Sequence, residues 1–495
     1  MRCRELALQV IPCCSVYPLK RFRLRWAPLV LVASAVVVSC QSDRGGVVLE
    51  ISAQVDSTVT PPVLRLSSSP NQLARTNWAE VIVDPDLVIG GGASGFGAVA
   101  DVAELSDHRI AVLDPLLHQI HLFSEDGAFE MAFGREGEGP AEFARPLALE
   151  RVGDQLVLWQ SPERRALKRF EHDGVLIADA PTPVDGDWDQ LLKRSPAVVG
   201  PITRGPEDPA FRLVGGNEDL FVLVQADESL ALQEASHSFP WDNPPAYVLR
   251  LGPDLEVEDT IATVEGAPMR AVSSDAILVP NGMRGSVRVA EEDYLGQRPL
   301  IAAGQGWMAV ARSKGHGIDV FGSGGRVILR VEWPPSTEKV SEEERYDAAR
   351  WLLAHQLLST QAGEDADQLG RAEIQEGLDV TALEWTPFPS KVPELMGAWG
   401  SGSCLFLSGF APRDGITGAS LSILTVDLAS GTSLGSIRLV PKTRLEPDVR
   451  TNILDLSGGT VYEIGTQGIY LTTVNGMGEY FVERFAVPNG CWVEA

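Results

Sequence analysis

The amino-acid sequence predicts an all-β fold, a six-bladed β-propeller with a short helical insertion between blades four and five. Three observations support this prediction. Two alternating apolar segments flank a polar turn between Arg109 and Phe133, a similar unit follows 47 residues later, and strand and turn signals then recur along the chain. Short strands separated by regularly spaced turns are typical of β architectures.

The clearest unit runs from Arg109 to Phe143. Its segments RIAVLD and PLLHQIHLF read as strands, and the turn SEDG ends at Gly127. A shift of 47 residues aligns FSEDG, ending at Gly127, with FEHDG, ending at Gly174. Similarity at a fixed period of this size predicts an array or a propeller.

Two markers each recur six times along the chain, a short apolar strand and the turn that follows the next strand. The strands are expected at 109–113, 155–159, 219–224, 307–311, 404–408 and 460–464, and the turns at Gly127, Gly174, 252–254, Gly325, Gly431 and 475–476. The rival arrangement is two packed β-sandwich domains. Sandwiches need not repeat their turn chemistry every ~45–50 residues, so we favour the propeller.

Residues 1–39 have the features of a signal peptide of lipoprotein type. A basic patch at 20–25 precedes an apolar run at 26–38, which is shorter than the ~20 residues of a membrane-spanning helix. The ending Val37-Val38-Ser39-Cys40 resembles a bacterial lipobox, which implies cleavage before Cys40 and lipid attachment to its thiol. The alternatives are an ordinary signal with an incidental cysteine, or an uncleaved anchor.

The expected location is therefore the cell envelope, with the protein lipid-anchored on the periplasmic or extracellular side. Gln41 does not favour retention at the inner membrane, which makes the outer membrane the expected destination. Residues 40–77 are rich in Ser, Thr, Pro and Asn and read as a flexible tether, and the propeller is expected over 78–490. Within the propeller, 78–89 is expected to supply one strand to the last blade and so close the ring.

The net charge of −26 bears on partners. Without residues 1–39, which hold six basic residues and one acidic residue, the balance is 35 basic against 66 acidic residues, or −31. Such a body repels phosphate backbones, so we expect no nucleic-acid partner. A cationic ligand, a metal ion or a basic protein surface is favoured instead, and solubility alone is the plainer explanation.

The segment GREGEGPAEF resembles the loop of bacterial six-bladed propeller proteins related to NHL repeats. The matching positions are Gly134, Gly137, Gly139, Pro140, Glu142 and Phe143, whereas Ala141 replaces the usual glycine. Close similarity covers about residues 97–180. The resemblance implies a secreted or lipid-anchored propeller, of a kind for which most members have no assigned activity.

Two long polar segments, 175–218 and 265–297, are expected as loops on the propeller faces. A helix is predicted over about 342–358, because Ser341 begins a capping-box pattern. Its apolar positions, spaced as on one helix face, are Tyr346, Ala349, Leu353 and Leu357. Packing of this stripe on the propeller rim is the favoured interpretation over a lid on the central channel. A short helical turn is also expected at 187–192.

The Gly-rich loop is the candidate binding site. The residues proposed to bind are Arg135, Glu136, Glu138, Glu142 and Arg145, with Asp114 nearby. Oxygen ligands so close in sequence suit a divalent cation such as calcium. The plainer interpretation, which we favour, is a connector between blades whose Glu and Arg side chains pair with each other. Asp114 is expected to cap a turn through backbone N–H groups.

Other chemistry-bearing residues give weaker signals. His118 and His121 lie three apart in a predicted strand and would point to opposite sides, which disfavours a shared metal. Cys404 and Cys491 are the two cysteines of the body and could form a disulfide in an oxidising compartment. No nucleophile elbow, HExxH motif, P-loop or dinucleotide fingerprint is present, so no catalytic residue is predicted.

The sequence thus favours a monomeric binding or scaffold module, anchored to a membrane by lipid, that holds a protein, peptide or glycan. No cofactor is predicted. The alternative is a metal-dependent hydrolase or lyase with one ion in the central channel, since ligands scattered over a ring leave no local motif.

Overall fold

The computed structural model describes most of the expected propeller. Its described residues are 52–75, 81–91, 95–144, 146–160, 166–181, 211–216, 219–225, 245–266, 269–278, 284–292, 299–312, 316–335, 394–395, 397–409, 421–441, 461–474 and 479–486. The predicted signal peptide, Cys40 and both predicted helices, 187–192 and 342–358, lie outside these ranges. Among the described residues, no helix is both long and apolar enough to span a bilayer.

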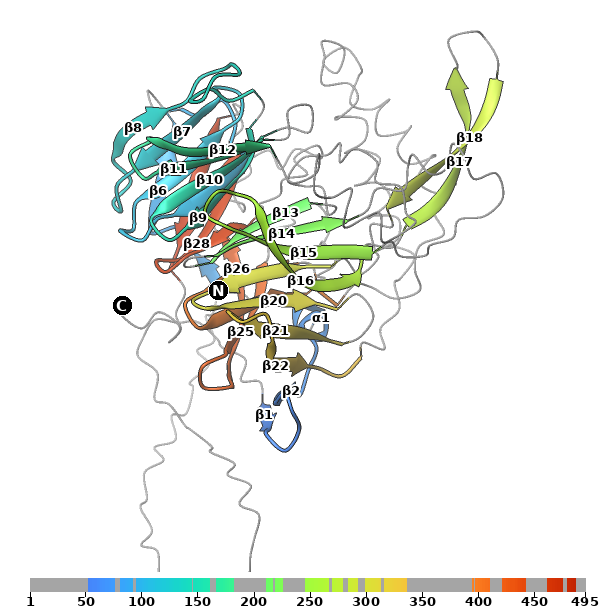
Figure 1. Cartoon of the computed structure of the whole chain (residues 1–495). Helices are drawn as coiled ribbons and strands as arrows, with labels where there is room; N and C mark the ends of the chain where they lie inside the picture. Colours follow the sequence, from blue (N-terminus) through green and yellow to red (C-terminus); the bar gives the residue numbers. More distant parts are fainter. Residues whose placement is uncertain are drawn as a thin grey trace, which may run out of the picture. The chain divides into compact units, whose positions relative to one another are not determined.

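The fold is an all-β six-bladed propeller, which confirms the predicted fold class (Figure 1). Each blade is an antiparallel sheet of four strands taken in order from the ring centre outward. Blade one is β5 (Asp101–Glu104), β6 (Ile110–Asp114), β7 (Gln119–Phe123) and β8 (Phe129–Phe133); blade two is β9 (Pro146–Val152), β10 (Gln155–Gln160), β11 (Ala166–Glu171) and β12 (Leu176–Pro181); blade three is β13 (Phe211–Gly215), β14 (Leu220–Gln225), β15 (Pro245–Leu251) and β16 (Val257–Glu265). Blade four is β19 (Ile301–Gly304), β20 (Trp307–Ala311), β21 (Gly317–Gly322) and β22 (Val327–Glu332); blade five is β23 (Gly397–Ser401), β24 (Cys404–Ser408), β25 (Leu421–Asp427) and β26 (Thr432–Pro441); blade six is β27 (Val461–Ile464), β28 (Ile469–Val474), β29 (Tyr480–Phe485) and β4 (Leu87–Gly90).

The ring closes through the innermost strands. β5, β9, β13, β19, β23 and β27 contact one another in that order, and β27 contacts β5 again. Six apolar clusters fill the gaps between successive blades, each drawing residues from two neighbours. The second strands are packed on both faces, which explains continuous apolar runs such as IAVLD in β6, where all five residues are buried. Outer strands such as β8 have exposed positions.

Close contact between innermost strands requires a small residue at Gly215. A Cβ added there would overlap the Arg151 carbonyl oxygen of blade two. Glycine is the residue without a side chain, so it allows this approach of two backbones. Its position at the end of β13 lets blade three lie directly against blade two.

The N-terminal segment forms a belt over three blades, defined here as residues 53–75 and 81–90. β1 (Ala53–Asp56) and β2 (Val63–Leu66) extend the sheet of blade four, with β2 parallel to β22. β3 (Val81–Val83) pairs in parallel with β26 of blade five, and β4 becomes the fourth strand of blade six. Between them, α1 (Pro70–Arg75) contacts β24 and β25 of blade five.

The belt corrects the tether predicted over 40–77, because β1, β2 and α1 pair with or pack on the blades. The apolar residues of VLRL in β2 explain the difference, since Leu64 and Leu66 are buried in the cluster between blades four and five. The prediction that 78–89 closes the last blade is confirmed by β4, whose residues Leu87–Gly90 pair antiparallel with β29.

Two ends of the ring differ in their connections. We call the end that carries the connections between first and second strands, and between third and fourth strands, the turn face. From β5 onward, no connection there exceeds five residues: they are 105–109, 124–128, 153–154, 172–175, 216–219, 252–256, 305–306, 323–326, 402–403, 428–431 and 465–468. We call the opposite end the loop face.

From β5 onward, every connection longer than ten residues joins strands at the loop face. These connections are 134–145, 182–210, 226–244, 266–300, 333–396, 409–420 and 442–460. The hairpin of β17 (Met269–Leu278) and β18 (Arg284–Glu292) belongs to 266–300 and forms its own two-stranded sheet. This hairpin corrects the loop predicted at 265–297. The loop predicted over 175–218 is likewise interrupted, by β12 and β13.

Arginines link the rims of neighbouring blades on the turn face. Arg169, Arg250 and Arg484 occupy equivalent positions in the third strands of blades two, three and six. Each directly precedes a buried apolar residue near the end of its strand. Each guanidinium donates to a backbone carbonyl oxygen in the third-to-fourth turn of the next blade, namely that of Pro253 (3.0 Å), Ser323 (2.9 Å) or Glu125 (3.3 Å). The last link joins blade six to blade one.

The marker pattern is confirmed in five blades and wrong in the sixth. Five marker strands correspond to second strands, but 460–464 corresponds to the innermost strand β27. The second strand of blade six is β28. The predicted turn at 475–476 lies outside the described residues and follows β28 rather than a third strand. The fourth strand of blade six is β4, which comes from the N-terminal part of the chain. The third strand, β29, is therefore not followed by a turn into a fourth strand.

Candidate functional site

The Gly-rich loop is folded around one carboxylate. The Oε2 atom of Glu142 accepts hydrogen bonds from the backbone N–H groups of Glu138 (2.9 Å) and Gly139 (2.8 Å). Its Oε1 atom accepts from the Arg135 guanidinium, with Nε at 2.9 Å and a second nitrogen at 2.6 Å. The Gly139 N–H, followed by the Arg135 side chain, holds the pKa of Glu142 below its usual value.

Buried side chains fix the same loop to blades one and two. Phe143 is fully buried in the cluster between these blades, and its carbonyl oxygen lies 2.7 Å from His118 Nδ1. The buried ammonium group of Lys168, in β11 of blade two, donates to the carbonyl oxygens of Gly139 (2.8 Å) and Pro140 (2.9 Å). It also donates to Asp179 Oδ2 (3.1 Å). The loop is thus an ordered connector between blades.

Two of the residues predicted to bind a ligand instead form an ion pair with each other inside the loop. Glu142 and Arg135 pair with each other, as the connector interpretation requires. Glu136 is exposed and forms an isolated bridge with Phe143, and Glu138 is exposed in the same loop. Arg145 lies outside the described residues. Within the ranges that the structure describes, no group of three or more His, Cys, Asp or Glu residues is placed to hold a metal ion.

Asp114 is a buried turn cap. Its Oδ1 atom accepts from the N–H groups of Leu116 (3.0 Å) and Leu117 (2.9 Å), as predicted, and its Oδ2 atom accepts from Gly97 N–H at 2.7 Å. The second contact ties the end of β6 to the strand connection that precedes β5. With both oxygens used by backbone donors, Asp114 has a structural role.

His118 and His121 lie in different environments, as their spacing predicts. His118 is in a turn with a φ of 55°, whereas His121 is buried in β7 beside Phe96, Phe123 and Phe129. Burial lowers the pKa of His121, partly offset by the Asp114 carboxylate. The imidazole is therefore expected to be neutral inside this aromatic cluster.

Ionisable groups gather on the innermost strands of three blades, a feature that the sequence did not signal. Asp101 in β5 accepts from Leu149 N–H of blade two at 2.8 Å. Glu463 in β27 retains limited solvent exposure. Burial raises the pKa of Glu463 to about 8; the Arg151 guanidinium opposes this shift and the Glu104 and Asp101 carboxylates add to it. We call Asp101, Glu104, Arg151 and Glu463 the central cluster.

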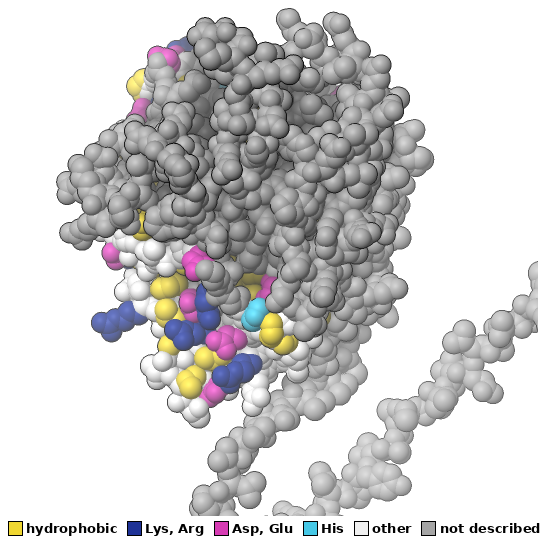
Figure 2. Space-filling view, turned by 90° about the vertical axis from the view of Figure 1, so that its right-hand side faces the viewer, with side chains coloured by type: hydrophobic (Ala, Val, Ile, Leu, Met, Phe, Trp, Pro, Cys, Tyr) yellow, Lys and Arg dark blue, Asp and Glu magenta, His cyan; other side chains and the backbone are white. Residues whose placement is uncertain are grey.

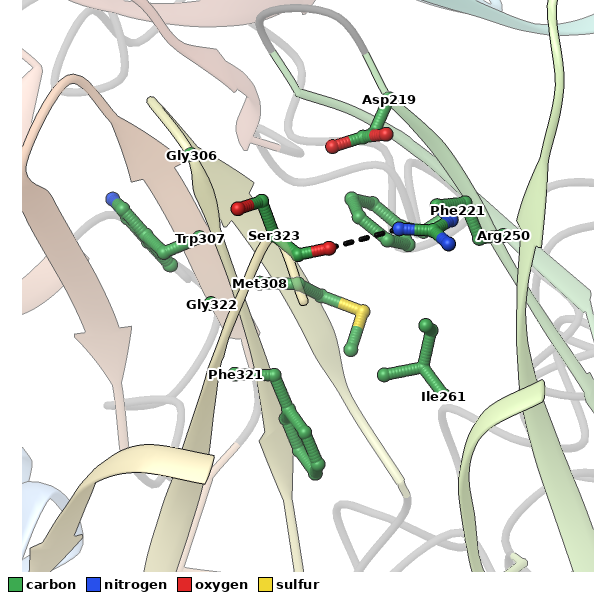
Figure 3. Close-up of a pocket in the computed structure, with 10 residues that line it drawn as sticks. All are labelled: Asp219, Phe221, Arg250, Ile261, Gly306, Trp307, Met308, Phe321, Gly322 and Ser323. Carbon is green, nitrogen blue, oxygen red and sulfur yellow. Dashed lines mark hydrogen bonds between the residues drawn. The ribbon is translucent and has the colours of Figure 1, made fainter. Parts of the chain in front are cut away.

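A shallow cleft lies between blades three and four on the turn face (Figure 3). Its floor is apolar and includes Phe221, Met308 and Phe321, while Asp219 and Arg250 stand at its edge. Arg250 is held by the Ser323 carbonyl oxygen, so the cleft is braced by one of the arginine links. Figure 2 shows charges of both signs intermixed with hydrophobic side chains on the described part of another side of the molecule.

Cys404 is buried in β24 and takes part in a disulfide. Its partner lies outside the described residues, as does Cys491. The pairing of Cys404 with Cys491 therefore stays a prediction.

Comparison with known proteins supports the architecture. A protein-family model described as a 6-bladed beta-propeller matches residues 96–150, which include blade one and the connection into blade two. No curated protein matches the chain.

Three solved structures illustrate the likeness. A Bacteroides fragilis protein described as exported has 10% identity and a TM-score of 0.38, over 86% of this chain and 99% of that one. Virginiamycin B lyase from Staphylococcus aureus has 10% identity and a TM-score of 0.30, over 79% and 97% of the two chains. A gluconolactonase from Xanthomonas campestris has 12% identity and a TM-score of 0.29, over 83% and 99%. At these identities and scores, none of the three assigns an activity to this chain.

Proposed function

We propose that this propeller is an extracytoplasmic binding or scaffold module, anchored by lipid at Cys40, whose loop face holds a protein, peptide or glycan partner. One observation carries the proposal: from β5 onward, all seven connections longer than ten residues join strands at the loop face, and none does so at the turn face. Binding residues are disproportionately found on loops held by a rigid scaffold. The hydrogen-bonded turn face supplies that scaffold.

Contacts between blades support the scaffold role of the turn face. Ser106 hydrogen-bonds to Asp154 of the next blade, and Gln305 N–H donates to the Gly402 carbonyl oxygen across 2.9 Å. These two bonds join the first-to-second turns of blades one and two and of blades four and five, and the arginine links join blades two and three, three and four, and six and one. These contacts hold neighbouring blades in fixed relative positions, so the strands that bear the long connections are supported by a braced ring.

Site-specific photo-crosslinking in cells tests the binding face. A photo-reactive amino acid is placed at Leu116, which is 67% exposed on the loop face, and in a second strain at Val175, which is 57% exposed on the turn face. The two positions match in side-chain type and exposure. We expect crosslinked species with Leu116 and few with Val175. Equal crosslinking at both positions, or crosslinking at Val175 alone, contradicts the proposal.

Labelling with a fatty-acid analogue tests the anchor separately. The wild-type chain is expected to incorporate label and to fractionate with the outer membrane, whereas Cys40→Ala should lose both properties. Retention of label in Cys40→Ala contradicts lipidation of this residue. A metal analysis of the purified protein bears on the metal-dependent alternative, which a tightly held stoichiometric ion would favour.

A further inference from the structure

Three residues from three separate segments meet at the loop face between blades four and five. His316 lies between β20 and β21, Trp333 follows β22, and Glu394 precedes β23. The Nδ1 atom of His316 lies 2.7 Å from Glu394 Oε1, and the Trp333 indole N–H donates to Glu394 Oε2. The backbone also connects the group, since Trp333 N–H donates to the His316 carbonyl oxygen at 3.1 Å.

These contacts fix the form of the imidazole. A carboxylate whose two oxygens both face nitrogen atoms acts as an acceptor, so Nδ1 of His316 carries the hydrogen. In the neutral ring, the lone pair then resides on Nε2. The Trp333 and Glu394 side chains are largely buried, at 5% and 12% exposure, whereas the His316 side chain is 40% exposed. The arrangement therefore anchors one nitrogen inside the protein and leaves the imidazole accessible.

We propose that His316 is a general base on the loop face and that the face hydrolyses an uncharged or cationic ester. A histidine oriented through Nδ1 by a carboxylate is the arrangement that activates a nucleophile through Nε2. Glu394 and Trp333 are positioning residues, because they act through His316. The charge of −26 disfavours an anionic substrate. This activity goes beyond the proposed binding role and does not depend on a partner protein.

The reaction is balanced without an added cofactor. Nε2 of His316 takes a proton from a water molecule while the water oxygen bonds to the ester carbonyl carbon. On collapse of the intermediate, the bond from that carbon to the leaving oxygen breaks, and the leaving oxygen takes the proton from Nε2. Ester and water yield acid and alcohol, with no change in oxidation state.

Hydrolysis of p-nitrophenyl acetate by the full chain, purified in detergent, tests the assignment. His316→Gln should lower the rate at neutral pH by about 100-fold or more, the low end of what general-base catalysis contributes. His172→Gln is the matched control, because His172 is an exposed imidazole on the turn face, away from Glu394. His172→Gln should keep the wild-type rate within about two-fold, because Glu394 does not orient the His172 imidazole.

Glu394→Gln separates the positioning role from a structural one. It should lower kcat and leave KM nearly unchanged, because it disturbs the orientation of the base without removing a substrate contact. Wild-type rates in His316→Gln, or equal losses in His316→Gln and His172→Gln, would overturn the proposal. Should His316→Gln fail to fold, carbethoxylation of the wild-type chain gives a second readout. Loss of activity must then follow modification of His316, and loss that follows another histidine overturns the assignment.

Discussion

Glu104 in the innermost strand of blade one accepts a hydrogen bond from the Tyr470 hydroxyl of blade six at 3.0 Å, and both side chains are buried. The same carboxylate accepts from Thr466 N–H (3.2 Å) and Gln467 N–H (3.1 Å) in the turn after β27. Burial raises the pKa of Tyr470, with the Glu104 carboxylate adding to the shift. One acidic side chain thus joins the first blade to the last.

Tyr470→Phe should lower the free energy of unfolding by about 1.5–3 kcal/mol, the typical contribution of a hydrogen bond to a charged group. Glu104→Ala should be more destabilising, because it removes the acceptor of the Tyr470 hydroxyl and of two backbone N–H groups, those of Thr466 and Gln467. Urea unfolding measures both. Glu125→Gln, at an exposed position in blade one, is the control and should stay within about 0.5 kcal/mol of wild type. A neutral Glu104→Ala would show that ring closure does not depend on this contact.

Removal of an arginine link between blades should also lower the free energy of unfolding. Arg169→Met, Arg250→Met or Arg484→Met should each reduce the free energy of unfolding by about 1–2 kcal/mol, because the link to the next blade's turn is lost while the apolar stem remains. Arg135→Met is the comparison, since its side chain is 77% exposed and pairs only within the Gly-rich loop. Thermal or urea unfolding checks the ranking. Losses for Arg135→Met equal to those of the three links would contradict it.

Glu463 predicts a pH dependence of stability. Its pKa is raised to about 8 in the folded state, while the unfolded chain ionises near the ordinary value of 4.5. Between these values the folded state binds the extra proton, so this group makes stability fall as pH rises from 4.5 to about 8. Glu463→Gln should flatten that decline and raise the melting temperature most at pH 8. An identical pH profile in the variant would rule out this origin.

Glu142 predicts a pH dependence of the opposite sign, with the structure less stable at low pH. Its pKa is lowered by the Gly139 N–H and by Arg135, so the order it gives the loop should persist above pH 4.5 and be lost as pH falls through the lowered value. Glu142→Gln should speed hydrogen exchange at the amides of Glu138 and Gly139, which this carboxylate binds. Glu136→Gln changes an exposed neighbour and should leave both amides unaffected. Protection unchanged in Glu142→Gln would contradict the anchoring role.

Truncation tests the N-terminal belt. A chain beginning at residue 45 keeps β1 to β4 and should fold to a monomer with a single cooperative melt. A chain beginning at residue 91 removes them and exposes edges of blades four, five and six. Exposed strand edges promote association, so this variant should aggregate in size-exclusion chromatography. A stable monomer from residue 91 onward would show that the belt is dispensable.

The parts of the fold that the sequence predicts are those set by local chemistry. Alternation in Arg109–Phe133 and the glycines at 127 and 174 identify blades one and two, because hairpin turns and buried strands leave local patterns. Apolar second strands such as β20 and β24 are visible for the same reason. The turn-capping role of Asp114 also follows from its place after a buried strand.

Long-range pairing is what the sequence conceals. Glu104 and Tyr470 are 366 residues apart, and nothing near either residue identifies the other. β2 is short and lies in a polar segment, so its pairing with β22 overrides a composition that reads as a tether. The three segments that bring together His316, Trp333 and Glu394 are likewise separate, and lone residues of these types are common in any sequence.

The order in which the chain is made has a consequence for the N-terminal belt. β2, β3 and β4 are synthesised before their partners β22, β26 and β29, which belong to the last three blades. The ring therefore cannot be completed until the C-terminal strands have emerged. A chain that must wait in this way stays open during synthesis, and an open chain is the form that can be threaded through an export channel before it folds.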